Sequence, residues 1–214
     1  MATAAVTLEG RSRPGERRSQ AERRSEAERR LLQAAVRIVA EQGLERFTLA
    51  EVGEAAGYSR GLPAHYFGSK DGLVGALAAH IVGGFGRGLV RSEKHVAGLE
   101  RLLGTASFYF DSAQRDPLTT RALFAVLGEA FTNPALQKRI GELNAQSVKP
   151  LADNIRAGIA AGDIRKTVNA KAQAVLILSG LRGAVAQWLV DPDGIDLKAL
   201  RGEFIASLKR SLAP

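Results

Sequence analysis

The sequence contains no cysteine among its 214 residues. This absence excludes disulfide bonds and thiolate-ligated metal sites, and it fits a reducing compartment. The N-terminus lacks the continuous apolar core of a signal peptide, and no apolar run approaches the roughly 20 residues of a membrane span. We therefore expect a cytoplasmic protein without membrane segments.

Patterns typical of catalytic, metal or nucleotide sites are also lacking. The histidines His65, His80 and His95 show no metal-ligand spacing, and no nucleophile elbow or paired-carboxylate pattern is present. The glycine-rich stretch GGFGRG, residues 83–88, has neither a preceding strand nor the following Gly-Lys-Ser/Thr of a nucleotide loop. We expect no metal and no cofactor, and a small all-α enzyme is kept only as an alternative.

The net charge of +8 permits an acidic partner such as nucleic acid. Residues 1–85 carry 12 Lys and Arg against 10 Asp and Glu, whereas residues 86–214 carry 18 against 12. Charge alone therefore permits a DNA site but does not locate it. Residues 1–24 are rich in Arg, Ser and Glu, which predicts a flexible basic arm or a frayed helical extension.

Hydrophobic residues recur at helical spacing along nearly the whole chain. In residues 31–39, LLQAAVRIV, the apolar positions fall on one helical face. Gly43 and Gly162 are expected to end helices, while Asp116-Pro117 and Asn133-Pro134 each place a capping side chain before a proline at the first helical position. The pattern predicts an all-α protein of about nine helices.

Residues 48–67, TLAEVGEAAGYSRGLPAHYF, form the most informative segment. Thr48 and Glu51 make a capping box, and Gly57 supplies a left-handed C-cap. Ser59 is expected to cap a second helix only two residues later. Two short helices joined so tightly must cross at a large angle, which is the helix-turn-helix unit, whose second helix enters the DNA major groove.

Residues 25–85 resemble the DNA-binding head of TetR-type transcriptional repressors. The resemblance implies a three-helix head (motif 48–67), a long fourth helix and, over residues 86–214, an α-helical ligand-binding and dimerisation domain. The tail LRGAVAQWLVDPDGIDLKALRGEF is similar to a C-terminal type of the family that includes choline-responsive repressors. The implied function is a homodimeric bacterial repressor that releases a palindromic operator when a small molecule binds. A non-ligand-gated architectural DNA-binding protein is the other alternative, but it would not need about 130 further residues.

The recognition segment also supplies the candidate DNA contacts. Arg60 is expected to touch a base or phosphate, and Lys70 a phosphate, because it follows Ser69 at the start of the fourth helix. The family usually has Leu-Tyr where this chain has Pro63-Ala64, and that tyrosine often touches the DNA backbone, so His65 and Tyr66 are candidates to take over its contact. The predicted DNA-binding set is Thr48, Ser59, Arg60, Gly61, Leu62, Ala64, His65, Tyr66 and Lys70.

Three consecutive aromatic residues, Phe108, Tyr109 and Phe110, lie in a helix predicted over about residues 98–115. Three adjacent helical residues span roughly 200° of arc, so at least one should face a cavity or a partner helix. We expect a pocket between this helix, the helix bearing Phe124 and Phe131, and a helix kinked near Pro150. The candidate ligand residues, each of which could instead be core, are Phe108, Tyr109, Phe124, Phe131 and Trp188.

Residues 170–190 are apolar over more of a helix circumference than one internal face requires. Such a helix is buried on two sides. Pairing it and the closing helix, residues 195–212, with their symmetry mates gives a self-complementary four-helix interface. The predicted dimer contacts are Leu176, Gly180, Gly183, Ala184, Gln187, Leu200, Phe204 and Leu208.

Overall fold

In a computed structural model that describes residues 19–214, the chain forms nine α-helices and no strand within that range. The expected all-α class is confirmed. The helices are α1 (Gln20–Gln42), α2 (Leu49–Ala55), α3 (Leu62–Phe67), α4 (Lys70–Ser92), α5 (Leu99–Arg115), α6 (Pro117–Glu129), α7 (Pro134–Ala161), α8 (Ala170–Val190) and α9 (Leu197–Leu212).

The first helix begins earlier than the sequence pattern indicated. Ser19 caps α1 by accepting a hydrogen bond from the Glu22 N–H (3.1 Å), and the Glu22 carboxylate accepts in return from the Ser19 N–H (2.7 Å). This capping box fixes the helix start at Gln20. Residues 20–24 therefore belong to α1 rather than to the predicted arm, and residues 1–18 of that arm lie outside the described part of the chain.

The other predicted helix boundaries mostly hold. Gly43 (φ +77°) and Gly162 (φ +85°) end α1 and α7 with positive φ angles that a side chain would disfavour. Asp116 and Asn133 accept hydrogen bonds from the first-turn N–H groups of α6 and α7, each followed by a proline whose missing donor costs nothing there.

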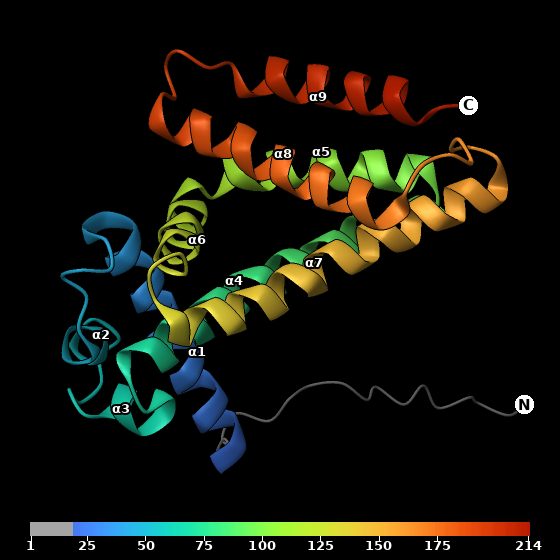
Figure 1. Ribbon diagram of the computed structural model, residues 1–214. Coiled ribbons are helices and arrows are strands. Elements are labelled where there is room, and N and C mark those ends of the chain that lie inside the picture. The colour runs from blue at the N-terminus through green and yellow to red at the C-terminus, as the bar shows by residue number, and fades with distance from the viewer. Residues whose placement is uncertain (1–18) are drawn as a thin grey trace, which may run out of the picture.

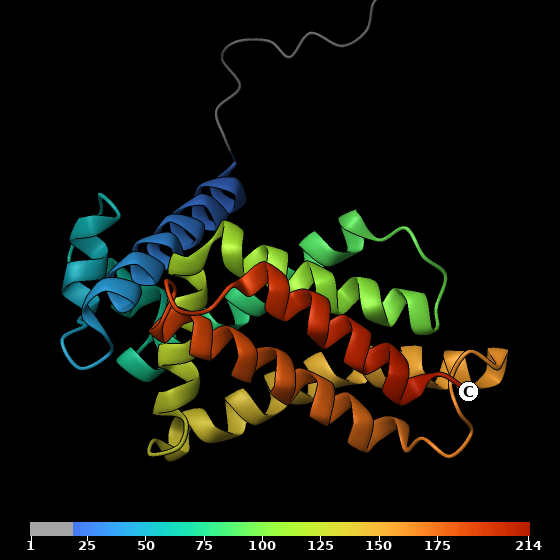
Figure 2. The same ribbon diagram turned by 90° about the horizontal axis from the view of Figure 1, so that it is seen from above.

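The helices assemble into a small head and a larger body (Figure 1). The head consists of α1, α2 and α3 around the first half of α4. Helices α4 and α7 run side by side from the head into the body, and α6 packs against α1. The view from above shows α8 and α9 neighbouring one another across the body (Figure 2), where α9 also packs on α5.

Two hydrophobic cores hold this arrangement together. The first joins the head helices to α6 and the start of α7, and includes the fully buried Phe47, Leu73 and Leu77. The second joins α5, the end of α7, α8 and α9 around Phe110 and Ile155. Since the first core contains residues of both halves, the expected division at residue 85, which falls inside α4, does not separate independently packed units.

Two helices, α4 and α8, are long and apolar enough to cross a membrane by length and composition. The expectation that no apolar run approaches the length of a membrane span is therefore wrong. Both helices contribute buried residues to the cores, as core helices of a soluble protein also do. The two spans are therefore weak evidence for a membrane.

Candidate nucleic-acid interface and ligand pocket

The predicted capping box at the start of α2 is present. Thr48 Oγ1 accepts from the Glu51 N–H (3.3 Å), and the Glu51 carboxylate accepts from the Thr48 N–H (3.0 Å). At the other end Gly57 has φ +78°, and the Tyr58 N–H donates to the Gly53 carbonyl (2.8 Å). This left-handed closure turns the chain sharply after two turns of helix, as predicted.

Gly53 sets how closely the two short helices approach each other. A Cβ atom at this position would lie 2.5 Å from the Ser59 carbonyl oxygen and 3.2 Å from the Arg60 Cα. Both are backbone atoms and cannot rotate away. The close crossing of α2 and the segment leading into α3 therefore requires glycine here.

Ser59 is not the side-chain cap that the sequence suggested. Helix α3 begins at Leu62, its N-cap is Gly61, and no side chain caps it. The Leu62 N–H donates to the Ser59 carbonyl (3.1 Å), so that carbonyl is already satisfied without a donor from Pro63. The proline consequently sits at the second helical position, where the lack of an N–H is tolerated.

The exposed face of this segment contains most of the predicted DNA contacts. Thr48, Lys70 and the residues Ser59, Arg60, Gly61, Ala64 and His65 are all exposed. Leu62 and Tyr66 are half-buried and pack against the first core. The structure thus leaves a continuous polar edge at the start of α3 and gives two of the nine candidates a packing role.

Besides Thr48, three candidates already have side-chain partners within the chain. Arg60 Nε lies 3.4 Å from a Glu54 carboxylate oxygen, with both side chains mostly exposed, so this ion pair is weak. Lys70 Nζ donates to the carbonyls of Leu44 (2.6 Å) and Glu45 (3.4 Å). The Tyr66 hydroxyl donates to the carbonyl of Arg24 (3.3 Å) in α1. Lys70 and Tyr66 therefore tie the motif to α1 and its following loop.

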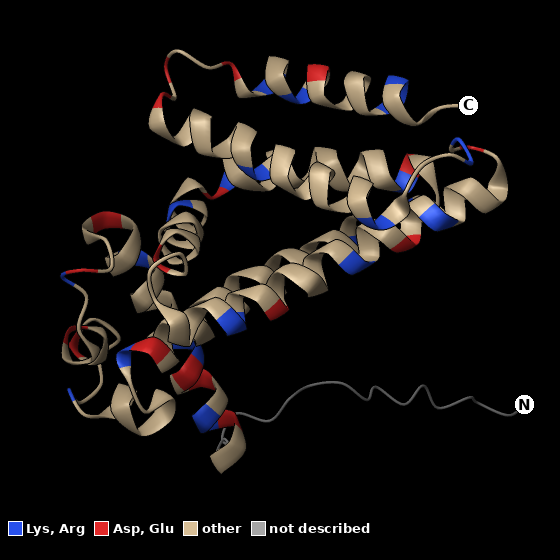
Figure 3. Ribbon diagram, viewed as in Figure 1, with Lys and Arg blue, Asp and Glu red and all other residues tan. Residues whose placement is uncertain are grey.

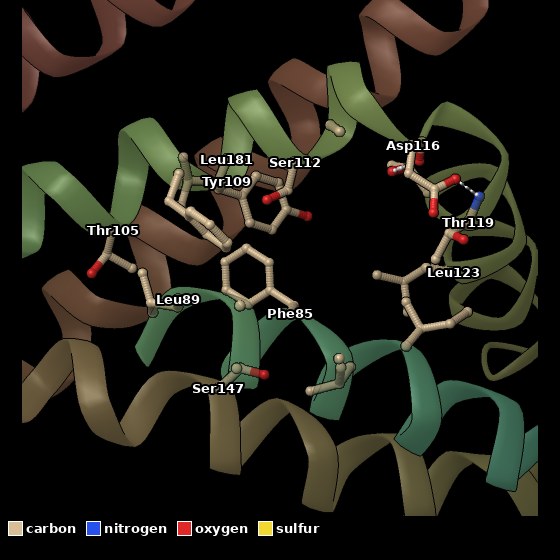
Figure 4. A pocket seen from close by; sticks show the side chains of 18 of the residues that line it. Phe85, Leu89, Thr105, Tyr109, Ser112, Asp116, Thr119, Leu123, Ser147 and Leu181 are labelled. Carbon is tan, nitrogen blue, oxygen red and sulfur yellow. Dashed lines mark hydrogen bonds between the residues drawn. The ribbon is translucent and has the colours of Figure 1, made fainter. Parts of the chain in front are cut away.

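A pocket of about 1150 Å³ opens between the head and the body. Its walls come from α4, α5, α6, α7 and α8, with residues of α1 at one end. Phe85 of α4 extends toward α5 (Figure 4), where its ring centroid lies 5.2 Å from that of Phe108 and 5.4 Å from that of Tyr109. These three rings form an aromatic cluster in the wall of the pocket.

Two of the five predicted ligand residues, Phe108 and Tyr109, line this pocket, and Phe110 points into the second core. The other three are corrected. Phe124 and Trp188 pack against the second core, and Phe131, just beyond α6, is 86% exposed. Phe85 was not among the predicted residues, because local spacing in the glycine-rich stretch, which is helical, does not show which helix the ring faces.

The carboxylates around the pocket all have partners. Glu93 pairs with Arg101 Nε (2.9 Å) and accepts from two backbone N–H groups. Asp116 caps α6 through the Thr119 N–H (3.0 Å), and Asp153 pairs with Lys149 (2.7 Å) on the same helix and with a neighbouring arginine.

Arg182 of α8 also lines the pocket and has no carboxylate partner among residues 19–214. Its Nη1 donates to Asn144 Oδ1 (2.7 Å), but its Nε is buried and has no hydrogen-bond partner among residues 19–214. The buried hydroxyl of Tyr109 likewise has no partner there. Burial lowers the pKa of Arg182 and raises the pKa of Tyr109, although the positive charge of Arg182 partly opposes the rise.

The outer face of α8 is unusually apolar for a surface. Leu176 is 64% exposed and Val190 85% exposed, and Gly183 and Gln187 are exposed between them. Figure 3 shows most of this helix free of charge, since Lys171 and Arg182 are its only charged residues.

The predicted dimer residues divide between this face and the second core. Leu208 is buried, and Ala184, Leu200 and Phe204 pack against the core. A Cβ atom at Gly180 would lie 2.9 Å from the Phe204 ring, so Gly180 allows α8 to approach α9 of the same chain rather than a helix of a partner. Leu176, Gly183 and Gln187 remain on the outer face.

Within residues 19–214 no three His, Cys, Asp or Glu side chains are grouped so as to hold a metal ion. What the described residues do provide is a helix-turn-helix with an exposed recognition edge and a large pocket behind it. These features define a DNA-binding protein with a ligand-binding body.

Comparison with known proteins agrees with this class. Residues 31–77 match the family model of bacterial regulatory proteins of the tetR family, and residues 98–212 match that of the C-terminal part of BetI-type transcriptional repressors. The HTH-type transcriptional regulator BetI of Burkholderia cenocepacia (strain HI2424) is 30% identical over 168 residues, covering 75% of this chain and 84% of its own. BetI of Burkholderia lata is 31% identical over 170 residues, with the same coverage.

Solved structures share the fold. A TetR-family regulator from Rhodococcus sp. superposes with a TM-score of 0.81 at 21% identity, covering 88% of this chain and 100% of its own. A regulator from Saccharomonospora viridis in complex with choline gives 0.76 at 20% identity, covering 89% and 99%. FadR from Bacillus subtilis in complex with stearoyl-CoA gives 0.74 at 21% identity, covering 86% and 98%.

The chain belongs to the TetR family of bacterial transcriptional regulators. It is a ligand-responsive DNA-binding repressor and not an enzyme.

Proposed function

We propose that the protein acts as a homodimer whose two heads bind successive major grooves of a palindromic operator, about 34–36 Å apart. A small molecule in the pocket favours a conformer whose heads no longer match that spacing. The coupling can be no larger than the difference in the ligand's affinity for the two conformers.

The observation that carries this proposal is the composition of the pocket wall. Val36 and Arg37 of α1 line it together with His80 and Phe85 of α4. Helix α1 packs against α2, and α4 begins directly after α3. A molecule in the pocket therefore touches the two helices that hold the helix-turn-helix in place.

We place the DNA contacts on the exposed edge at the start of α3, with Arg60 as the side chain that reaches a base. Ser59, Gly61, Ala64 and His65 flank it, and Thr48 and Lys70 lie where phosphates would pass. Lys70 can contact a phosphate while it holds the loop carbonyls, since an ammonium has three donors.

We place the dimer contact on the outer face of α8 and the neighbouring surface of α9. An exposed apolar face of this kind marks an interaction site in a soluble protein. A two-fold axis makes such a face self-complementary, which a palindromic operator requires.

The experiment selects DNA from random libraries with the full chain and measures binding by fluorescence anisotropy while small metabolites are added. We expect a palindrome to be selected and at least one metabolite to release it. The pocket-filling variant Ser147→Phe should bind the same DNA but no longer release it, because Ser147 lines the pocket away from the head. Selection of no sequence above random binding would contradict the proposal.

The two ligand-bound structural neighbours hold chemically unlike molecules, choline and stearoyl-CoA. The shared fold therefore leaves the effector open, and its chemistry has to be inferred from the residues of this pocket. We expect the protein to act in the cytoplasm, where the operator lies.

A further inference from the structure

We propose that the effector is an amphipathic organic anion, whose charged group binds Arg182 and Tyr109 and whose apolar part lies against Phe85 and Phe108. This inference rests on the proposed function of the pocket as the effector site. It concerns only the class of molecule that the pocket takes.

The first observation is the lack of a counter-ion for Arg182. The side chain is half-buried, and its polar neighbours within residues 19–214 are neutral: Nη1 donates to the amide of Asn144, and the Tyr109 hydroxyl lies beside the guanidinium. Buried charges in proteins are generally paired, because removing an ion from water is costly unless an opposite charge compensates it. The pocket therefore presents a half-buried guanidinium, with a buried Nε, whose counter-ion has to be supplied.

The second observation is that Tyr109, beside Arg182, presents a donor as well. Burial raises the pKa of Tyr109, so the hydroxyl stays protonated at neutral pH. The arginine has donors only, and the phenol has no acceptor to donate to among the described residues. A carboxylate or phosphate oxygen accepts from both groups at once, which a cationic or purely apolar molecule cannot do.

The third observation is the balance of free charge in the wall. The three carboxylates of the wall already have partners. Glu93 pairs with Arg101, Asp116 caps α6, and Asp153 pairs with Lys149 on the surface of α7. Three arginines that line the pocket, Arg37, Arg115 and Arg182, have no carboxylate partner among residues 19–214. A quaternary ammonium such as choline would meet aromatic faces here, but no free carboxylate and three arginines without a counter-ion.

The apolar part of the ligand is assigned to the aromatic cluster. The Phe85 ring packs against both Phe108 and Tyr109, and Leu89 and Leu181 lie next to this cluster, while Leu123 faces it from the other side of the pocket (Figure 4). A volume of about 1150 Å³ exceeds what a small polar metabolite fills, since pockets for drug-sized molecules usually measure about 300–1,000 Å³. The site therefore suits a molecule with one anionic end and a sizeable hydrocarbon or aromatic body.

The test compares three probes with the same ten-carbon chain: decanoate, decanol and decyltrimethylammonium. Binding to the full-length protein is measured by titration calorimetry below micelle-forming concentrations. We expect decanoate to bind at least tenfold more tightly than the cation. Arg182→Gln should abolish this preference, and Arg182→Lys should keep part of it. The matched control Arg121→Gln removes an exposed arginine of α6 and should keep the preference unchanged.

A second variant separates ligand recognition from folding. Tyr109→Phe removes only a hydroxyl that is unsatisfied in the ligand-free protein, so thermal stability without ligand should stay equal or rise. Decanoate affinity should nevertheless fall several-fold. A purely structural tyrosine would not give these opposite changes.

Several results would overturn the proposal. They are equal or tighter binding of the cation, no binding of any of the three probes, and an unchanged preference for decanoate in Arg182→Gln.

Arg182 also borders a hollow of about 280 Å³ between α7 and α8, next to the outer face of α8. If Arg182→Gln dissociates the dimer in sedimentation while the probes bind as before, the counter-ion belongs to a second copy of the chain. If decanoate binds with the expected preference but does not release DNA, the ligand class stands and the proposed control of DNA binding fails.

Discussion

At Gly53, a single hydrogen atom in place of a side chain decides the geometry of the DNA-binding unit. The helices on either side carry few buried residues of their own: α2 buries Val52 and Gly53, and α3 buries Pro63. With so little apolar contact, the crossing of α2 and α3 depends on backbone approach more than on side-chain packing. A small residue at this position is typical of a helix-turn-helix unit, whose two helices approach closely there.

Gly53→Ala should destabilise the protein by about 1–3 kcal/mol, the usual cost of forcing an extra methyl group into packed structure. The added Cβ would lie 2.5 Å from the Ser59 carbonyl oxygen, so the recognition segment must move. Urea unfolding measures the first effect and operator affinity the second. Gly61→Ala is the matched control for the unfolding measurement only, because a Cβ at Gly61 meets nothing within 4 Å and should leave stability nearly unchanged, whereas Gly61 lies on the proposed DNA-binding edge.

Arg60→Ala should weaken operator binding by about 1–3 kcal/mol and relax base preference, if the contact is bidentate to guanine. The side chain is exposed and only weakly held by Glu54, so it is free to reach the DNA. The measurement is affinity for the selected operator and for single-base variants of it. Arg210→Ala, which removes an exposed arginine of α9, controls for the change in net charge. Equal affinity and equal base preference in Arg60→Ala would remove this residue from the interface.

At the scale of the element, α4 joins the two functions of the protein. Its first residue, Lys70, holds the loop after α1, and its second half carries Phe85 into the pocket. Capping and turn chemistry predicted the start of this helix, since Ser69 accepts from the Gly72 N–H as an N-cap should. The aromatic residue in its glycine-rich part could not be assigned from spacing, because which helix faces it depends on long-range packing.

Lys70→Ala should weaken binding to the operator and to random DNA by similar factors, because a phosphate contact carries no sequence information. The dependence of log affinity on log salt concentration should fall by about one unit. The variant also frees the carbonyls of Leu44 and Glu45, so a loss of stability is expected as well. Unfolding curves separate the two effects. A loss restricted to the operator, with an unchanged salt dependence, would show that Lys70 acts only by holding the loop.

Other elements show where local sequence rules stop being sufficient. The caps at Asp116 and Asn133 were predictable, because a cap depends on residues within one turn. The start of α3 was not, because the carbonyl of Ser59 is bonded within a tight turn rather than within the expected helix. The inward position of Phe124 and the outward position of Phe131 likewise follow from how α6 rests on its neighbours.

For the molecule as a whole, the apolar surface of α8 requires an explanation that one chain does not supply. The sequence predicted a helix buried on two sides, and the chain buries only one of them, through Ile177, Leu181 and Val185. The opposite face keeps Leu176 and Val190 in contact with solvent. Pairing with a second copy would bury this face, and it would also hold two heads at a fixed separation.

Gly183→Arg and Leu176→Asp should therefore give a folded monomer that no longer binds the operator at physiological salt. A Cβ atom at Gly183 meets nothing within 4 Å in the single chain, and the position is exposed, so an arginine there should disturb an interface with a partner rather than the fold. One head would contact a single half-site and gain too little affinity to compete with random genomic DNA. Sedimentation gives the mass, circular dichroism the fold, and anisotropy the DNA binding.

Gly180→Arg is a contrasting variant rather than an interface probe, because it would collide with Phe204 and lower the stability of the chain itself. An intact dimer that still binds the operator in both Gly183→Arg and Leu176→Asp would place the two-fold contact on another surface.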